Sequence, residues 1–247
     1  MSCEDENQEA VSSSSSQVSP RLRDSQQLAR EVNWDHHGRM FESSIILLDW
    51  IGIVVFTVTG ALVASRNQMD LIGFILLGTI TGIGGGTIRD LLLDAHPILW
   101  IERPQYLGVC ILVSIVVFFT AHFAASRYRL ILWLDAVGLA LFATAGTEKA
   151  LTLGKGALVA VTMGVITACF GGIIRDVLGK EDSIIFSHEI YVTAAVFAAL
   201  IYVCLDFLGI SREISVVLSI VAGFGLRAGA LLYGWSLPRY RARPPVA

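Results

Sequence analysis

The sequence predicts an all-α membrane protein with seven transmembrane helices, arranged as two inverted three-helix repeats and a seventh helix. Composition is the first reason: 54% of the 247 residues are hydrophobic and only 16% are charged, whereas a soluble domain carries about 25% charged residues. The apolar residues also form blocks of about 20 residues, the length of a helix that crosses a bilayer. Finally, much of the chain repeats itself at an offset of 86 residues.

The two ends of the chain are polar. Residues 1–44 are acidic and rich in serine, and because this composition cannot bury a core, we predict a disordered tail. The stretch lacks the basic start and the apolar segment of a secretory signal. Residues 236–247 form a short basic tail that prolines interrupt.

Seven apolar blocks between these tails predict the helices in order. Three belong to a first repeat (residues 45–125), three to a second repeat (130–208), and the last stands alone (214–235). Lys and Arg are almost evenly divided between the two membrane sides, so the positive-inside rule gives only a weak lean towards a cytoplasmic C-terminus. The predicted helices are residues 45–65, 71–93, 104–125, 130–149, 156–178, 190–208 and 214–235.

The internal repeat becomes visible when two glycine-rich motifs are aligned, GGGTIRD ending at Asp90 and FGGIIRD ending at Asp176. No gap is needed between residues 49–90 and 135–176. Each copy holds three helices, and an odd number sends the second copy into the membrane from the opposite side, as in the inverted repeats of transporters. Equivalent pairs are Asp49 and Asp135, Gly52 and Gly138, Phe56 and Phe142, Thr81 and Thr167, Gly85 and Gly171, and Arg89 and Arg175.

The glycines of these motifs allow two interpretations. On a helix, Thr81, Gly85 and Arg89 share one face, as do their equivalents Thr167, Gly171 and Arg175. The glycines either let two helices approach closely or interrupt the helices beside a watery cavity, where freed carbonyls can coordinate a cation. We favour interruption because the feature recurs in both halves, at Gly84, Gly85, Gly86, Gly171 and Gly172.

The motif charges are expected inside the bundle, because ionised groups that face lipid are expensive. Arg89 and Asp90 are neighbours in sequence, as are Arg175 and Asp176, and neighbouring side chains point in different directions around a helix. We therefore predict pairing across the repeats, Arg89 with Asp176 and Arg175 with Asp90. Such pairs would either lock the two halves together or line a pathway.

Five further charges lie in or near the apolar blocks. Asp49 and Asp135 stand near predicted helix starts, where an acidic cap meets the positive end of the helix dipole. Glu148 and Lys149 close the fourth helix, and we expect them to be solvated at the membrane interface. Arg227 lies deep in the last helix, where it either pairs with an aspartate or faces a pore.

These residues resemble a known family. LDWIGIVVFTVTGALVAS, GTITGIGGGTIRDLLL, LDAVGLALFATAGTEKAL and GVITACFGGIIRDVLG are similar to the bacterial family with paired glycine-transporter domains, which is related to trimeric intracellular cation (TRIC) channels. The resemblance covers about residues 45–208 and implies a homotrimer with one pore per subunit. It implies that the second and fifth helices kink at their glycines beside that pore, and that the motif charges belong to it. The second motif departs from the first by having Phe170 in place of a glycine.

Two functions remain from the sequence. One is a passive channel for monovalent cations, chiefly potassium, and the other is an alternating-access transporter of glycine or another small neutral solute. A membrane scaffold without flux is a third possibility, against which the recurrent glycine motifs count. We expect no enzyme, cofactor, metal or nucleic-acid partner: the net charge is only −3, the cysteine spacing fits no metal site, and the last helix holds no lysine for a retinal Schiff base. Plasma and intracellular membranes both fit the composition.

Overall fold

The computed structural model describes residues 47–123, 127–180 and 190–236, and these form a bundle of helices. Six described helices are long and apolar enough to cross a membrane, and one apolar helix, α7 (Val192–Phe207), is shorter. The six are Leu47–Arg66, α2 (Leu71–Leu92), α4 with the 3-10 turn η1 (Gln105–Phe123), α5 (Arg127–Thr152), α6 (Ala157–Leu178) and α8 (Arg212–Tyr233).

The predicted class is confirmed as an all-helical membrane protein with six or seven membrane-crossing helices. Each of the seven predicted blocks overlaps one of the helices named above. The predicted tail at residues 1–44 lies outside the described residues, as does all of the predicted C-terminal tail except residue 236. A short helix that was not predicted, α3 (Leu99–Glu102), lies between α2 and α4.

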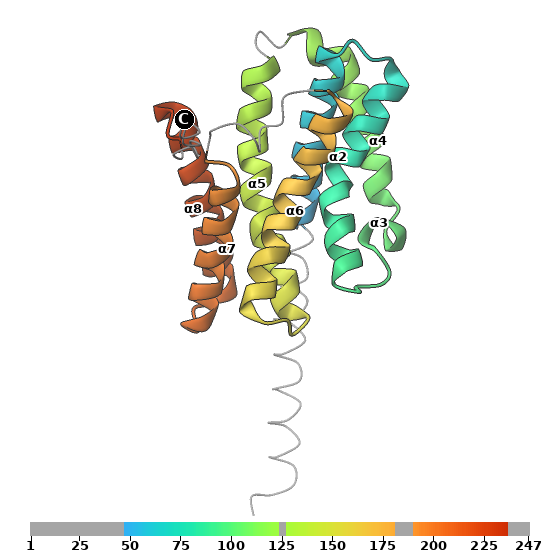
Figure 1. The fold of residues 1–247 in the computed structure, drawn as a ribbon. Helices are drawn as coiled ribbons and strands as arrows, with labels where there is room; N and C mark the ends of the chain where they lie inside the picture. The colour runs from blue at the N-terminus through green and yellow to red at the C-terminus, as the bar shows by residue number, and fades with distance from the viewer. Residues whose placement is uncertain (1–46, 124–126, 181–189, 237–247) are drawn as a thin grey trace, which may run out of the picture. The chain divides into compact units, whose positions relative to one another are not determined.

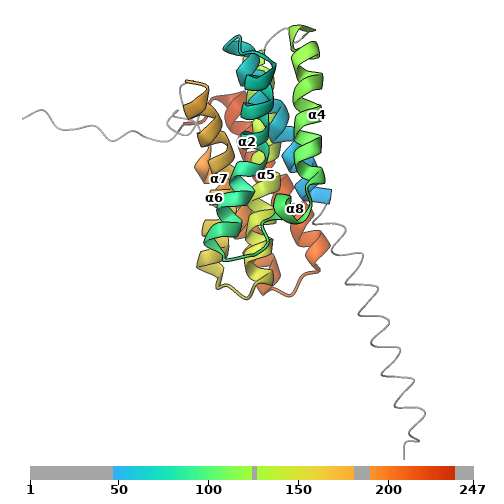
Figure 2. The same cartoon turned by 90° about the vertical axis from the view of Figure 1, so that its right-hand side faces the viewer.

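Successive long helices run in alternate directions along the bundle, so α2 is antiparallel to α6 (Figures 1 and 2). These two helices pack against each other although more than 60 residues separate them in sequence. α5 lies in the interior of the bundle, where it contacts α6, α7 and α8. It is the most buried of the long helices: 72% of its most apolar stretch lies inside the protein, compared with 33% for α2.

Local sequence signals set the ends of several helices. Asp70 precedes α2, and its carboxylate accepts a hydrogen bond from the Gly73 backbone N–H at 2.8 Å, which satisfies one of the free donors of the first turn. α8 ends at Gly234, whose φ of 66° lies in the left-handed region. Glycine adopts this conformation without a Cβ penalty, so the residue terminates the helix.

Both glycine groups lie inside continuous helices. α2 runs without interruption through Gly84, Gly85 and Gly86, and α6 runs through Gly171 and Gly172. The predicted interruption of the two helices is therefore wrong. Since an unbroken helix keeps its carbonyls in its own hydrogen bonds, the freed carbonyl ligands that we expected do not arise in this conformation.

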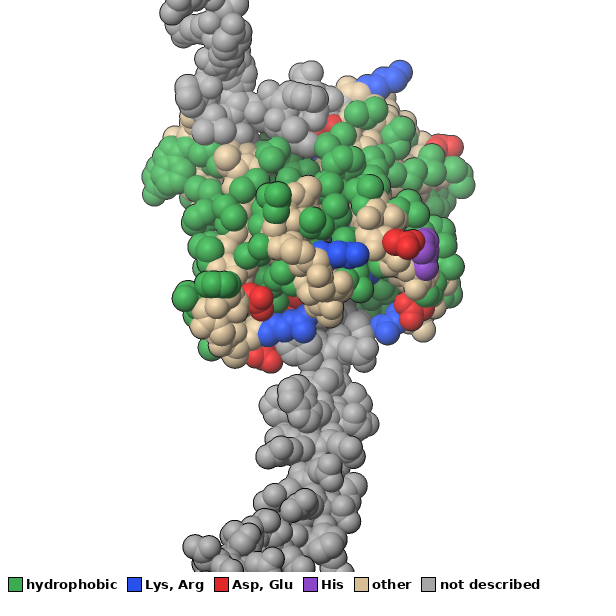
Figure 3. All heavy atoms as spheres, turned by 60° about the horizontal axis from the view of Figure 1, so that its bottom comes forward, with side chains coloured by type: hydrophobic (Ala, Val, Ile, Leu, Met, Phe, Trp, Pro, Cys, Tyr) green, Lys and Arg blue, Asp and Glu red, His purple; other side chains and the backbone are tan. Residues whose placement is uncertain are grey.

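The outer surface of the bundle is apolar. In Figure 3 hydrophobic side chains cover most of the visible sides, and the charged groups gather towards the end of the bundle that is turned to the viewer. Leu158 and Phe207 are exposed to 82% and 90%, which suits contact with lipid rather than water. The chain is accordingly a multi-pass integral membrane protein.

Candidate functional site

α2 and α6 touch through their smallest residues. A Cβ atom added to Gly85 would overlap the backbone carbonyl oxygen of Thr167, and one added to Gly171 would lie 2.7 Å from the carbonyl oxygen of Thr81. Real Cβ atoms do not approach backbone oxygens this closely, so both positions require glycine. The close-packing interpretation therefore holds at Gly85 and Gly171.

The two threonines at this crossing are hydrogen-bonded within their own helices. The Thr81 hydroxyl donates to the Leu77 carbonyl at 2.6 Å, and the Thr167 hydroxyl donates to the Met163 carbonyl at 2.6 Å. Thr81 is fully buried, as is Thr167. The structure thus brings the predicted residues Thr81, Gly85, Thr167 and Gly171 together at one place in the middle of the bundle.

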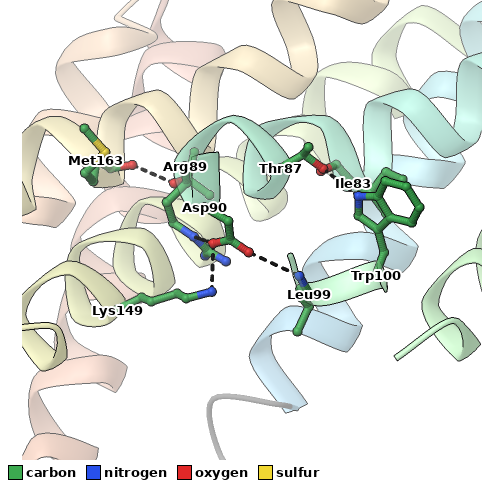
Figure 4. A network of polar contacts seen from close by, with 9 residues as sticks. Ile83, Thr87, Arg89, Asp90, Leu99, Trp100, Lys149 and Met163 are labelled. Carbon is green, nitrogen blue, oxygen red and sulfur yellow. Dashed lines mark hydrogen bonds and ion pairs between the residues drawn. The ribbon is translucent and has the colours of Figure 1, made fainter. Parts of the chain in front are cut away.

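A first cluster of charges lies at the C-terminal end of α2 (Figure 4). Asp90 accepts from Arg89 Nε at 2.8 Å and from Lys149 Nζ at 2.7 Å, both at its Oδ1 atom. Its Oδ2 atom accepts from the Leu99 backbone N–H at 3.3 Å. Arg89 and Asp90 are at most 1% exposed, so one buried carboxylate balances two cations.

A second cluster lies at the C-terminal end of α6. Arg175 donates from Nε to Asp176 at 2.9 Å and from Nη1 to Asp135 at 2.7 Å. These three side chains are between 0% and 3% exposed. Beside them, the Arg227 guanidinium lies over the Tyr191 ring, 5.2 Å from its centroid, and its Nη1 donates to the Ile190 carbonyl at 3.4 Å.

The predicted pairing across the repeats is wrong, because each motif arginine binds the aspartate that follows it. The reason is the antiparallel crossing of α2 and α6. Arg89 lies four residues beyond Gly85, and Arg175 lies four residues beyond Gly171, which is about 6 Å along each helix. The two arginines therefore lie on opposite sides of the crossing, and neither reaches the other motif.

Three further expectations are corrected. Asp135 lies inside α5 rather than at its start and binds Arg175, so it is no helix cap. Glu148 is only 1% exposed and binds Arg212 Nε at 2.6 Å. Lys149 is 28% exposed and binds Asp90, so both residues are held in ion pairs instead of being solvated. Asp49 is 6% exposed and belongs to the helix that is described from Leu47 onwards, and its predicted role as a cap stays a prediction.

A small cavity of about 20 Å³ adjoins the first cluster. A space of this size holds about one water molecule. The Trp100 indole N–H closes one side by donating to the Thr87 hydroxyl at 3.0 Å. The lining also includes Asp49, Ile83, Gly86, Arg89 and Phe142.

Sequence reasoning missed Tyr191 and Trp100, and it misjudged Lys149. The internal repeat gave no signal for the lysine, because the residue 86 positions earlier is Val63. Tyr191 and Trp100 lie outside the aligned segments and carry no motif. Within the described parts of the chain no group of three or more His, Cys, Asp or Glu side chains is placed to hold a metal ion.

A third polar set holds α8 against its neighbours. The Arg212 guanidinium binds Glu148 and donates from Nη2 to the Thr152 hydroxyl at 2.8 Å. About two turns further along α8, the Ser219 hydroxyl meets the Thr144 hydroxyl at 2.8 Å and donates to the Ala198 carbonyl at 2.8 Å. These contacts, together with Arg227, fix α8 against α5 and α7.

Comparison with known proteins gives consistent matches. Residues 46–122 and 132–206 each match the protein family described as "Glycine transporter". A UPF0126 membrane protein of Vibrio cholerae is 39% identical over 202 residues, covering 80% of this chain and 83% of that protein. The UPF0126 inner membrane protein YadS of Escherichia coli K12 is 37% identical over 198 residues, covering 78% and 94%.

Solved structures match over the same part of the chain. The TRIC trimeric intracellular cation channel orthologue from Rhodobacter sphaeroides is 53% identical, with a TM-score of 0.77, covering 78% of this chain and 100% of that chain. A prokaryotic TRIC channel in 0.5 M KCl is 32% identical, with a TM-score of 0.73, covering 79% and 100%. These relatives are channels and membrane proteins, not enzymes.

Proposed function

Since the chain belongs to the glycine transporter family, and since a TRIC cation channel 53% identical to it has the same fold, we propose that this protein is a channel for monovalent cations. We further propose potassium as the main permeant ion, one pore in each subunit and a homotrimer. The Rhodobacter relative is a trimeric intracellular cation channel, which supports the trimer and the passage of cations.

The observation that carries the proposal is the crossing of α2 and α6 between two buried clusters of charge. Ionised side chains inside a membrane bundle commonly mark ion pathways. Here Asp90 and Asp176 lie beyond the crossing on opposite sides, each with its arginine. A path along α2 and α6 would lead an ion from one cluster to the other and past the small residues at the crossing.

The crossing is closed in this conformation. The glycine faces of Gly85 and Gly171 lie directly on backbone carbonyls of the opposite helix, which leaves no passage between them. Conduction therefore requires α2 and α6 to separate or bend there. Glycine weakens a helix by about 1 kcal/mol relative to alanine, so we propose Gly84, Gly85, Gly86, Gly171 and Gly172 as the points where bending occurs.

We also propose that the two halves are inverted repeats. In a two-fold arrangement a contact between residues i and j is matched by a contact between their equivalents. A Cβ on Gly52 would lie 2.7 Å from the Phe142 ring, and a Cβ on the equivalent Gly138 would overlap the Phe56 ring. The two rings meet edge to face with centroids 5.0 Å apart. The reciprocal contacts of Gly85 and Gly171 have the same form and support the same symmetry.

Glycine transport is the second candidate. Asp49 and Arg89 line one cavity, and a zwitterion needs an acid and a base of this kind. The size of the cavity argues against glycine in this conformation, because about 20 Å³ accommodates about one water molecule. A bound amino acid would need a wider site.

The test is electrical recording from the purified full-length protein in a planar bilayer with potassium chloride, repeated with glycine on one side. Discrete unitary currents that reverse near the potassium potential would support the channel. A silent bilayer together with saturable glycine uptake into liposomes would overturn it in favour of the transporter. A silent bilayer without uptake would leave the scaffold as the remaining function.

A further inference from the structure

The last glycine of each motif faces a notch beside its motif arginine, but the two notches differ in their contents. At Gly86 the nearest atom to an added Cβ is Arg89 Nη2, 3.8 Å away, and the first-cluster cavity adjoins the position. At the equivalent Gly172 an added Cβ would lie 3.0 Å from the Tyr191 hydroxyl and 3.6 Å from Arg175 Nη2. Space is therefore open in the first half and filled in the second.

The arginines behave alike in the two notches. Among the described residues neither Arg89 Nη2 nor Arg175 Nη2 has a hydrogen-bond acceptor, although both side chains are at most 1% exposed. A guanidinium offers five donors, and in both halves the same nitrogen is the one that faces the glycine. The two motifs thus build matching notches, each with a donor directed into it.

Tyr191 fills its notch without being bonded there. Its hydroxyl is the nearest atom to a Cβ added at Gly172, before Arg175 Nη2 and Asp135 Oδ1, yet it has no hydrogen-bond partner in the described part of the chain. A buried hydroxyl without a partner is unfavourable. The ring therefore fills the space beside Gly172, but its hydroxyl gains no hydrogen bond there. A side chain that is held so weakly at its polar end can leave this position more easily than a hydrogen-bonded one.

Arg227 holds the ring from outside the repeat. Its guanidinium lies 5.2 Å from the Tyr191 ring centroid and is fully buried, and cation–π contacts strengthen when they are desolvated. Arg227 belongs to α8, which has no equivalent in the first half. The seventh helix thus supplies the difference between the two notches.

We propose that the Tyr191 side chain is a stopper, that is, a gate that blocks the notch at Gly172, the second of two equivalent notches along the ion path. Arg227 of α8 holds this side chain in place. The proposal rests on the proposed channel, because it assigns the closed end of that path. When Tyr191 leaves its position, space would open beside Arg175 and Asp135, as space is open beside Gly86. The gate at this end is then a side chain, distinct from the backbone contact at the crossing.

Native Cys169 is a convenient reporter for this notch. It lies in the same buried cluster as Tyr191 and is 3% exposed. The equivalent position in the first half is Ile83, which lines the open cavity. Two proteins with a single cysteine can be compared. In the first, Cys3, Cys110 and Cys204 are replaced by alanine and Cys169 remains. In the second, all four native cysteines are replaced by alanine and Ile83→Cys is introduced. The probe is the small cationic thiol reagent aminoethyl methanethiosulfonate, added to the full-length protein in liposomes.

The reagent is larger than the cavity of about 20 Å³, so the rates at both positions report transient opening of the helices. We expect Ile83→Cys to react about tenfold faster than Cys169, because opening at Ile83 displaces no side chain and protection follows the population of the open form. Tyr191→Ala should raise the Cys169 rate by about the same factor, and Arg227→Gln should raise it in part. Tyr191→Phe should leave it slow, since the ring remains. Tyr202→Ala is the matched control, because this buried tyrosine lies on α7 away from the notch, and it should leave the rate unchanged.

Equal rates at the two positions, or no change with either Tyr191→Ala or Arg227→Gln, would overturn the stopper. Gel filtration of each variant identifies a protein that has failed to fold, and Arg227→Gln keeps the proposal testable if Tyr191→Ala does so. Thiol rates do not depend on ion flux. Loss of the channel with the expected rates would therefore refute the proposed function alone, while potassium currents with unchanged rates would refute the stopper alone.

Discussion

Alanine at Gly85 should destabilise the protein, whereas alanine at the next position, Gly86, should not. A Cβ at Gly85 would overlap the Thr167 carbonyl oxygen, and because backbone cannot rotate away, α2 and α6 must move apart. At Gly86 the nearest atom to a Cβ is 3.8 Å away, which is an ordinary contact. The two substitutions are chemically identical and lie in the same turn of one helix.

The magnitudes follow from two opposing terms. Replacing glycine by alanine inside a helix gains about 1 kcal/mol in both variants. Forcing an extra carbon into a packed contact costs about 1–3 kcal/mol, and only Gly85→Ala incurs that cost. We therefore expect Gly86→Ala to be as stable as wild type or more so by up to about 1 kcal/mol. Gly85→Ala should be less stable than Gly86→Ala by about 1–3 kcal/mol.

Thermal unfolding of the purified variants in one detergent is the assay. A change of 1 kcal/mol shifts the Tm of a chain of this length by about 2–4 °C, so the two variants should differ by several degrees. Equal Tm values would refute the reasoning, since the crossing would then tolerate a side chain and could not be a tight backbone contact. A stable Gly85→Ala with a destabilised Gly86→Ala would place the contact on the wrong face of α2.

Two further predictions concern the polar contacts. Asp90→Asn should lower the free energy of unfolding by about 3–5 kcal/mol, because it removes the carboxylate that balances the buried Arg89 and the partly buried Lys149. Lys149→Met in the same chain should restore part of this loss, and a double variant no more stable than Asp90→Asn would contradict the pairing. Thr144→Val should cost about 1 kcal/mol by removing the hydroxyl that meets Ser219, measured by the same thermal assay, and an unchanged Tm would show that this contact does not hold α8.

The helix positions were predictable because they depend on local composition. A block of about 20 apolar residues is long enough to cross a bilayer wherever it lies in a chain. α5 and α6, for example, begin and end within about three residues of their predicted bounds, which is the usual error of such predictions. α3 was missed because four residues carry no periodic signal.

The partners of the charges were not predictable in the same way. That Arg89, Arg175 and Arg227 would be buried followed from the sequence, since lipid excludes charge. Which aspartate each would bind did not follow, and the predicted exchange between the motifs was wrong. The pair between Lys149 and Asp90 joins residues that are 59 positions apart, and only the tertiary packing, which sets the C-terminal ends of α2 and α5 side by side, brings them together.

The sequence alone determined that this is a membrane protein, where its helices lie, and that its two glycine motifs occupy equivalent positions. These properties depend on the hydrophobicity of successive residues and on the repetition of a sequence pattern, and both can be read from the order of the residues alone. The tertiary structure alone decided that Gly85 and Gly171 seal the crossing, that each arginine binds its own aspartate, and that Tyr191 fills one notch while the other stays open. Distances between side chains on different helices depend on the depth and angle at which the helices cross, and no local pattern encodes them.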